Sequence, residues 1–551
     1  MRLSLSERIA LAALPIAPAV AIPGSLNRFV FGKLAVATLG VLCATIAPAR
    51  GRLPRAARWW LTAAGLLLLL ATLRSQNPHA QLIGLPPRYE GIVALPVYLG
   101  CIAAGARLLG RDRASGSTAW FLRWLSLAAL AIGLVALLEA AGVDPLPGTG
   151  ARAGSLLGNA SDEGAVALVF LGPLTAIAVA GRRPLHIAAA AAAAASLICS
   201  GSRGALVGLL ALAVVLGLLT PRRRPATVIA VALAAVLLAA FVTPGVRERV
   251  LGTSPLASKT ATGRWLLLQE GVRLTAEEPL LGFGPSGFVD NVTREHTPEY
   301  ERVIGPENPP DSPHDWVLQA ALAGGAGLSL IALTLVFLTV RNGWRGLALQ
   351  PTAGEAAAYR GMLAGLAGYA VALMFHFTSP GTTPIAAVLA GALLAGELGP
   401  PSASGLLPRL GRVAALAATG VLLVLLMLAT VAELPLRNAV LDAAAGNARA
   451  ANRQFHYAQA WRPWDAQISQ LATHVFAKLA AVGLPNAAIL GASWSAKALA
   501  ADPRSVPTLE DASSLARARG ERHRALSLVR RARQIEPRSP SLLARLQDLL
   551  R

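Results

Sequence analysis

The sequence predicts an all-α fold, a polytopic bundle of membrane-spanning helices with a large external loop and a C-terminal domain of helical repeats. Three observations support this prediction. Of the 551 residues, 54% are hydrophobic and only 14% are charged, a composition typical of a membrane protein. The hydrophobic residues form runs of membrane-spanning length, and arginines are concentrated in the gaps between them. Beyond residue 433 these runs end, and a short motif recurs after 34 residues.

Membrane-spanning helices are expected throughout residues 1–433, which we assign to a transmembrane domain. A helix needs roughly 20 apolar residues to cross the hydrocarbon core, and fewer where its terminal side chains reach the interface. This criterion predicts about 12 or 13 spans, the first of which lacks the cleavage site of a signal peptide. The apolar segments are residues 9–22, 29–47, 59–73, 92–106, 121–141, 163–181, 185–199, 204–220, 226–243, 316–340, 357–377, 383–398 and 413–433.

The distribution of positive charge predicts the orientation of the chain. With a cytoplasmic N-terminus, the cytoplasmic segments carry 20 arginines, whereas the short outer connections carry five arginines and one lysine. This asymmetry obeys the positive-inside rule. The polar loop at about 244–315 and the C-terminal region 434–551 are therefore expected on the extracytoplasmic side.

Charge and cysteine content argue against two other classes of protein. A net charge of +21 would suggest a nucleic-acid partner in a soluble domain, but here most arginines lie between apolar segments, where they set topology beside anionic lipids. The three cysteines, Cys43, Cys101 and Cys199, lie in or at the ends of apolar runs without metal-type spacing. We expect no nucleic-acid partner, no disulfide framework and no zinc site.

The C-terminal region 434–551 is predicted to be a helical-repeat domain. Residues Ala501–Ser505 (ADPRS) recur as Ile535–Ser539 (IEPRS), with helical patterns at 512–519 and 525–534 around and between them. A 34-residue repeat of helix pairs that closes on proline resembles the tetratricopeptide class, although another array of helical hairpins would fit as well. Such arrays present a concave surface, so a protein partner is one expectation for this domain.

Residues 311–316 (DSPHDW), where the polar loop meets an apolar helix, are the first candidate for chemistry. Ser312 is expected to cap the helix, with Pro313 at its first position and Asp315 completing a variant of the capping box. His314 would then lie in the first turn, where the helix dipole disfavours the imidazolium form. A neutral histidine can accept a proton, whereas the alternative is an incidental histidine in a capped membrane helix.

Three outer arginines are candidates for binding an anion. Arg203 stands where a span begins from the outside, an exception to the positive-inside pattern, and unpaired N–H groups of the helix end lie beside it. Arg264 opens a helical-looking stretch of the outer loop that runs to about residue 276. Arg88 lies in another outer connection, and Glu90 is a candidate ion-pair partner for it.

Other motifs carry less weight. Residues 282–288 (GFGPSGF) formally match GxGxxG, but no strand precedes them and a proline interrupts them, so we interpret them as a turn. Asp162-Glu163 and Glu277-Glu278 are adjacent acidic pairs for which the sequence indicates no fixed partner. Without a DxD-like cluster, the arginines are expected to neutralise a phosphate leaving group, so the predicted reaction needs no metal and no cofactor.

Taken in order, several motifs resemble the O-antigen ligase and Wzy-type polymerase superfamily of bacterial membrane glycosyltransferases. The resemblance covers about residues 185–340 and rests on SRGA at 202–205, GRW at 263–265, LGFGP at 281–285, SPHDWVLQ at 312–319 and GGAGL at 324–328. Upstream, PRYEG at 87–91 and GSLLGN at 154–159 are also similar to family patterns. Asp315 replaces a common asparagine, and Ala160-Ser161 replaces the usual Pro-Asn.

The resemblance implies a transfer of glycan from an undecaprenyl-pyrophosphate carrier to a hydroxyl of lipid A core, a growing glycan or a protein. It implies a location in the bacterial cytoplasmic membrane, with the reaction on its outer face. By resemblance, His314 is the catalytic histidine, Arg203 and Arg264 contact the pyrophosphate, and Arg88 is a further candidate contact.

Three alternative functions remain open from the sequence. A peptidoglycan polymerase of the related shape and division type is expected to use a catalytic acid rather than this histidine. A transporter or flippase would place polar or broken helices at mid-bilayer, whereas the candidate residues here gather on one face. A membrane scaffold that binds partners through its repeats would have no need of Arg203, Arg264 and His314.

Overall fold

The computed structural model describes most of the chain, and within that part every regular element is a helix. This confirms the predicted all-α helix bundle. The described residues are 3–48, 51–75, 81–82, 84, 88–111, 116–146, 152–221, 223–243, 246–248, 251, 255–304, 312–395 and 406–551.

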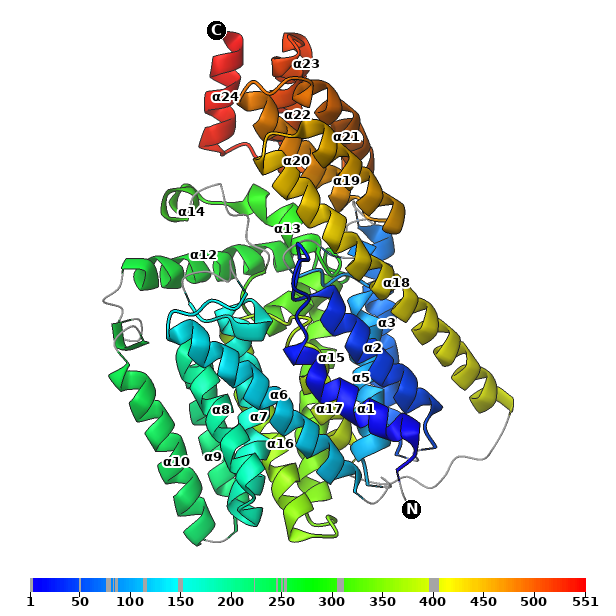
Figure 1. The fold of residues 1–551 in the computed structure, drawn as a ribbon, viewed down its shortest axis with the longest axis vertical. Coiled ribbons are helices and arrows are strands. Elements are labelled where there is room, and N and C mark those ends of the chain that lie inside the picture. The colour runs from blue at the N-terminus through cyan, green and yellow to red at the C-terminus, as the bar shows by residue number, and fades with distance from the viewer. Residues whose placement is uncertain are drawn as a thin grey trace.

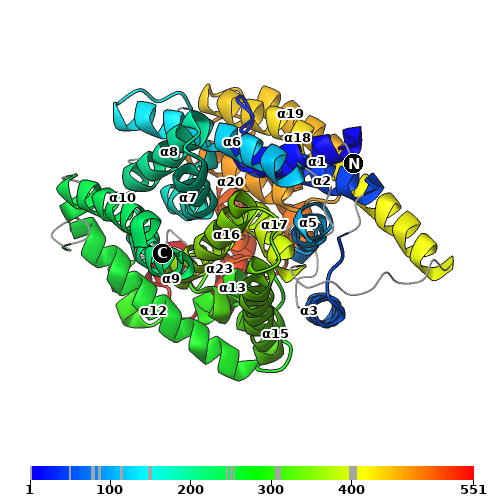
Figure 2. The ribbon, with the colours of Figure 1, turned by 90° about the horizontal axis from the view of Figure 1, so that it is seen from below.

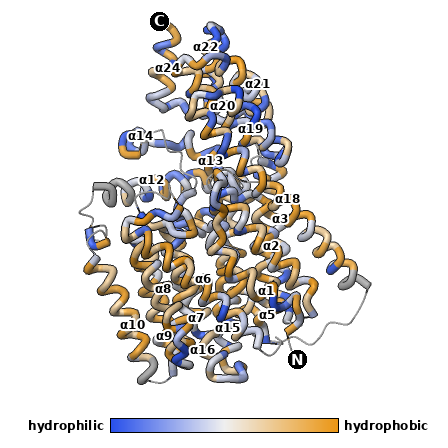
Figure 3. Tube along the Cα trace, viewed as in Figure 1, coloured by the Kyte–Doolittle hydropathy of each residue, from blue (hydrophilic) through white to orange (hydrophobic). Residues whose placement is uncertain are grey.

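Each of the thirteen predicted spans corresponds to a helix of the bundle in Figure 1. Among the described residues, six helices are long and apolar enough to cross a membrane: α3 (Arg55–Arg74), α6 (Ser117–Ala140), α7 (Ala160–Gly181), α15 (Trp316–Leu347), α16 (Ala353–Ala372) and α18 (Leu406–Ala444). Six more are apolar but shorter: α2 (Phe31–Ile46), α5 (Ala94–Leu109), α8 (Pro184–Ser200), α9 (Arg203–Leu219), α10 (Arg223–Val242) and α17 (Thr383–Leu394). The first helix, α1 (Leu5–Ile16), has 12 residues and belongs to neither group. Figure 3 shows hydrophobic residues along most of these helices.

Glycines bring α7, α9 and α16 into close contact at the centre of the bundle. A Cβ atom at Gly172 of α7 would lie 2.3 Å from the carbonyl oxygen of Gly361 in α16. Similarly, a Cβ atom at Gly208 of α9 would lie 2.5 Å from the carbonyl oxygen of Gly368. Small residues allow such approach of helix backbones in membranes. As a result, the N-termini of α7 and α9 meet the C-terminus of α16 at one end of the bundle.

The large loop between α10 and α15 folds over this same end (Figure 1). It contains α12 (Pro255–Glu277), α13 (Gly287–Val292), the 3-10 turn η3 (Thr293–Glu295) and α14 (Pro298–Val303). The loop has a small core of its own, in which Leu266, Leu274, Phe288, Val292 and Tyr300 are buried.

The C-terminal helices extend away from the bundle beyond this loop (Figure 1), and in the view from below α20 and α23 are seen behind the bundle (Figure 2). They are α19 (Ala448–Trp461), α20 (Gln467–Ala481), α21 (Ala487–Ala501), α22 (Val506–Ala518), α23 (Arg522–Ile535) and α24 (Pro540–Leu550). The proposed boundary at 433/434 lies inside α18, whose Leu436, Ala439 and Ala443 share a core with α19, α20 and α21.

The repeated motif marks equivalent positions in two helix starts. Ser505 caps α22 by accepting the N–H of Thr508, and Ser539 caps α24 by accepting the N–H of Leu542. Assignment of these helices to the tetratricopeptide class stays a prediction.

Candidate functional site

His314 lies just before a helix rather than inside its first turn. Helix α15 begins at Trp316, and its cap is Asp315, whose carboxylate accepts the N–H of Leu318 at 2.8 Å. The prediction that Ser312 caps the helix is therefore wrong. The hydroxyl of Ser312 instead accepts the N–H of His314 at 2.9 Å, and His314 adopts a left-handed conformation with φ 56°. Asp311 lies outside the described residues.

Helix α15, which covers the predicted span 316–340, is sharply bent after its second turn. Gly324 and Gly325 have non-helical backbone angles, with φ +75° at Gly325. The hydroxyl of Ser329 donates to the carbonyl of Val317 at 2.7 Å, although the two residues are 12 positions apart. Because a straight helix would separate them by about 18 Å, the short first part of α15 folds back beside the second.

The large loop between α10 and α15 is attached to this bend. Of the predicted turn at 282–288, residues 282–286 are non-helical and residues 287–288 begin α13. The N–H of Phe283 donates to the carbonyl of Leu322 at 2.6 Å. The N–H of Ala326 donates in turn to the carbonyl of Pro279 at 2.8 Å. These contacts fix the loop that carries Arg264 against the helix that follows His314.

Burial and neighbouring cations keep His314 neutral. Desolvation is the main cause that holds the pKa of His314 well below 6.5, and the positive charges of Arg264 and Arg88, together with His376, lower it further. Within the described part of the chain, the buried Nδ1 atom of His314 has no hydrogen-bond partner. The neutral state was expected, but its cause is burial among cations, because His314 precedes the helix whose dipole was invoked.

Arg264 is close enough to both His314 and Arg203 for their charges to interact. Burial is the main cause that lowers the pKa of Arg264 to about 10, with further contributions from Arg203 and Arg152, so the guanidinium remains charged at neutral pH. Arg264 lies within α12, which starts earlier than the sequence indicated, and Arg203 is the first residue of α9, capped by Ser202. The structure thus brings the predicted arginines of α9 and the outer loop to the same place.

Arg88 is held in the same region by a buried carboxylate. Its guanidinium pairs with Glu90 at 3.0 Å, as anticipated, and lies 4.7 Å from the ring centroid of Phe377. Glu90 also accepts the hydroxyls of Tyr98 and Thr378, each at 2.7 Å. One carboxylate therefore ties the connection before α5 to the connection before α17 and sets the position of Arg88.

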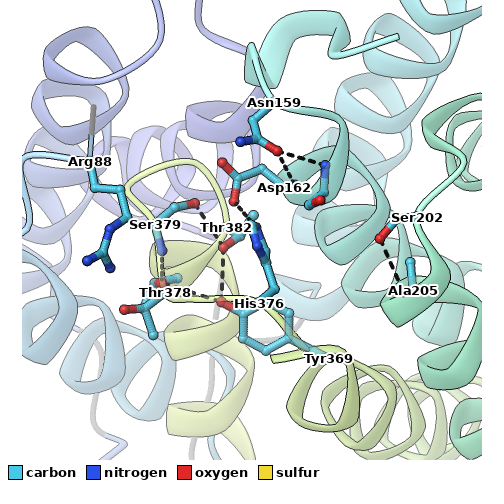
Figure 4. A network of polar contacts seen from close by, with 12 residues as sticks. Arg88, Asn159, Asp162, Ser202, Ala205, Tyr369, His376, Thr378, Ser379 and Thr382 are labelled. Atoms are coloured by element: carbon cyan, nitrogen blue, oxygen red, sulfur yellow. Dashed lines mark hydrogen bonds and ion pairs between the residues drawn. The ribbon is translucent and has the colours of Figure 1, made fainter. Parts of the chain in front are cut away.

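The structure adds a histidine that the sequence interpretation missed. His376 follows α16 and the 3-10 turn η4 (Leu373–Phe375), and its Nε2 atom lies 2.9 Å from the Oδ1 atom of Asp162 in α7 (Figure 4). The expectation that Asp162 and Glu163 have no fixed partner is wrong, since Glu163 also accepts the hydroxyl of Ser196 at 2.8 Å. The available signal was that His376 and Asp162 each lie at the outer end of a predicted span.

All four predicted site residues therefore lie at one end of the bundle, where Arg264 and Arg88 act on the neutral imidazole of His314 and Arg203 acts on Arg264. An unprotonated ring nitrogen can accept a proton, and guanidinium groups bind phosphate oxygens through planar pairs of N–H donors. The arrangement suits a substrate that has a hydroxyl to deprotonate and an anionic group to bind. Among the described residues, no group of three or more His, Cys, Asp or Glu side chains is placed to hold a metal ion.

Comparison with known proteins agrees with this interpretation. Residues 187–332, which include Arg203, Arg264 and His314, match the family model described as O-antigen ligase. No curated protein and no solved structure matches the chain. The family match supports glycan transfer in lipopolysaccharide synthesis by a multi-pass membrane protein. The similarity to the O-antigen ligase family therefore lies in residues 187–332 of the chain.

Proposed function

We propose that this protein transfers a glycan from an undecaprenyl-pyrophosphate carrier to an acceptor hydroxyl on the outer face of the bacterial cytoplasmic membrane. The acceptor is a lipid A core, a growing glycan or a protein. Its oxygen attacks the anomeric carbon of the donor sugar while the bond from that carbon to the pyrophosphate breaks, with inversion. The proton of the hydroxyl passes to His314, and the pyrophosphate leaves with the bonding electrons.

His314 is proposed as the general base because it combines a depressed pKa with an unoccupied nitrogen. The Nδ1 atom has no partner among the described residues, and the surrounding cations favour the neutral ring that can take up a proton. This observation carries the proposal. An imidazole already hydrogen-bonded at both nitrogens would be a structural group instead.

The arginines are proposed to bind the pyrophosphate and to stabilise the charge that develops on it. The charge of Arg203 affects Arg264, and an anion bound beside both guanidinium groups would relieve this repulsion. Arg88 is proposed as a third contact, presented by Glu90 and Phe377. Fixed cations in a partly dehydrated site can stabilise a leaving group without a metal ion.

His376 and Asp162 are proposed as positioning residues. The carboxylate of Asp162 fixes the orientation of the His376 ring, whose centroid lies 6.5 Å from that of His314. His376 thereby forms one wall beside the proposed base and adds to the causes that keep the pKa of His314 low.

We further propose a cytoplasmic N-terminus, with the transmembrane domain at 1–433 and an extracytoplasmic domain at 434–551 that can bind a protein partner. The outer loop and the C-terminal helices lie at the same end of the bundle, which supports placing them on one side (Figure 1). A reporter enzyme that is active only in the periplasm should be active when it is fused after Arg551. A cytoplasmic-only reporter active at the same position would reverse the proposed orientation.

Deletion of the gene followed by analysis of surface glycans tests the proposed function. Uncapped lipid A core would identify a ligase, single repeat units a polymerase, and loss of glycans from proteins a protein-glycosylating enzyme. Complementation with the intact gene should restore the glycan. An unchanged set of surface glycans in the deletion strain would contradict the proposal.

A further inference from the structure

A cavity of about 710 Å³ lies between the outer loop, the C-terminal helices and the connection that carries Arg88. Of its 26 lining residues, 18 are polar or charged. The walls come from α13, α20 and α22, and from the connections that contain Tyr89 and Asp502. A volume of this size is typical of small-molecule binding sites, which span roughly 300–1,000 Å³.

Tyr89 separates this cavity from the proposed catalytic site. It lines the cavity, while its neighbours Arg88 and Glu90 belong to the network beside His314. Tyr89 has φ 53°, its hydroxyl accepts the side-chain N–H of Asn27 at 2.8 Å, and its ring packs 4.9 Å from that of Phe31. A molecule in the cavity would therefore be one residue away from the proposed pyrophosphate site.

The polar side chains of the cavity are held in defined positions. Gln470 donates to Asp502 at 3.3 Å, and the Nδ1 atom of His474 lies 3.0 Å from a carboxylate oxygen of Asp511. Gln467 donates to the carbonyl of Gly84 at 2.7 Å, whereas its buried Oε1 atom has no hydrogen-bond partner within the described residues. Such preorganised donors and acceptors suit the hydroxyl groups of sugars.

The charge of the cavity restricts the glycans it can hold. One of its two arginines, Arg462, is paired within 2.8 Å with both Glu433 and Asp465. The carboxylates on the lining outnumber the arginines, and they are Asp290, Asp502, Glu510, Asp511 and Glu536. Burial is the main cause that raises the pKa of Asp290 to about 7; Asp502 adds to this shift and Arg504 opposes it. An anionic sugar would add to this repulsion.

We infer that this cavity binds an oligosaccharide segment of the substrate that is uncharged or bears amino groups, and that it discriminates against acidic glycans. The inference rests on the proposed glycan transfer, which gives the substrate class. A peptide usually binds along a sheet edge or in an apolar groove, whereas the described walls of this cavity are helices and connections that combine apolar surface with polar or charged side chains at 18 of 26 lining positions. It also lies on the side of Tyr89 away from the catalytic cluster, where a glycan can extend from the reacting sugar.

Calorimetric titration of the full chain in detergent micelles at pH 8 tests the inference. Three tetrasaccharides of equal length serve as probes: N-acetylchitotetraose, which is neutral; chitotetraose, which carries amines; and tetragalacturonate, which is anionic. We expect the first two to bind at least tenfold more tightly than the third. Gln470→Trp, which places a bulky side chain in the cavity, should weaken their binding at least tenfold, while Gln534→Trp at an exposed position of α23 should leave it unchanged.

A second variant provides an independent test in case Gln470→Trp misfolds. Asp290→Asn removes one carboxylate and should narrow the difference between the neutral and the anionic probe. The inference would be overturned if the three tetrasaccharides bound equally, if the anionic one bound best, or if none bound. It would also be overturned if a peptide occupied the cavity and the sugars did not. His314→Ala should lose glycan transfer but bind the probes normally. Normal transfer by His314→Ala would therefore contradict the proposed function, whereas failure of the unaltered protein to bind the probes would contradict only the inference about the cavity.

Discussion

The rings of His314 and His376 lie with centroids 6.5 Å apart and planes 23° from parallel. Phe377 contacts both, at 5.3 Å and 4.1 Å between centroids. His376 is tied through Nε2 to Asp162, whereas no described residue forms a hydrogen bond with the Nδ1 atom of His314. The buried Nδ1 atom of His376 likewise has no partner in the part of the chain that the structure describes, so the two rings differ in that a carboxylate holds the ring of His376.

Asp162→Asn should reduce turnover because an amide no longer fixes the orientation of His376 beside the base. We expect kcat to fall by about tenfold to a hundredfold, since misplacement of a catalytic group by ~1 Å can cost 10² in rate. KM should change little. Steady-state transfer with purified lipid-linked donor measures both constants. Asp548→Asn, at an exposed C-terminal position, is the control, and an unchanged kcat in Asp162→Asn would remove the positioning role.

The rate of transfer should stay high into mildly acidic solution. Protonation inactivates a base, so the acidic limb of kcat/KM follows the pKa of the free His314, which lies well below 6.5. Arg264 is one cause of this low value, so Arg264→Gln should move the limb to higher pH in addition to lowering the rate. The pH dependence of kcat/KM for the unaltered protein and for Arg264→Gln measures the position of this limb. A limb that moves to lower pH in Arg264→Gln would contradict this assignment.

Gly325→Ala should displace the outer loop from the bend of α15. A Cβ atom there would lie 2.1 Å from the carbonyl oxygen of Leu280, and the positive φ costs a further ~1–3 kcal/mol in a non-glycine residue. We expect faster proteolysis within residues 255–304 and a loss of transfer. Gly217→Ala is the control, because a Cβ atom there meets no other group within 4 Å. Normal protection of the loop in Gly325→Ala would show that the bend tolerates a side chain.

Arg462→Ala should loosen the C-terminal domain. The buried guanidinium pairs with Glu433 and Asp465, and its removal leaves two buried carboxylates without their cation. Breaking such a pair costs about 3–5 kcal/mol, so thermal unfolding in detergent should begin at a lower temperature. The exposed Arg453 of α19 offers a control in Arg453→Ala. Equal unfolding temperatures for the two variants would show that the buried pair contributes little.

The sequence was sufficient to locate the helices and to select the candidate arginines. The length of an apolar segment and the charges beside it can both be read from consecutive residues. It was insufficient where two nearby residues could both cap the same helix. Ser312 and Asp315 are both good capping residues, and the folded-back start of α15 selects Asp315. The His376–Asp162 pair could not be assigned from spacing, since it joins residues 214 positions apart through the packing of α7 against α16.

Single-turnover transfer from purified lipid-linked donor by His314→Ala tests the central claim most directly. A general base contributes about 10²–10⁴ to the rate, so the variant should lose at least ~100-fold in rate while it is inserted, folded and able to bind donor. His523→Ala, at an exposed histidine of α23, should retain full activity. A rate for His314→Ala equal to that of the unaltered protein would show that His314 does not take the proton.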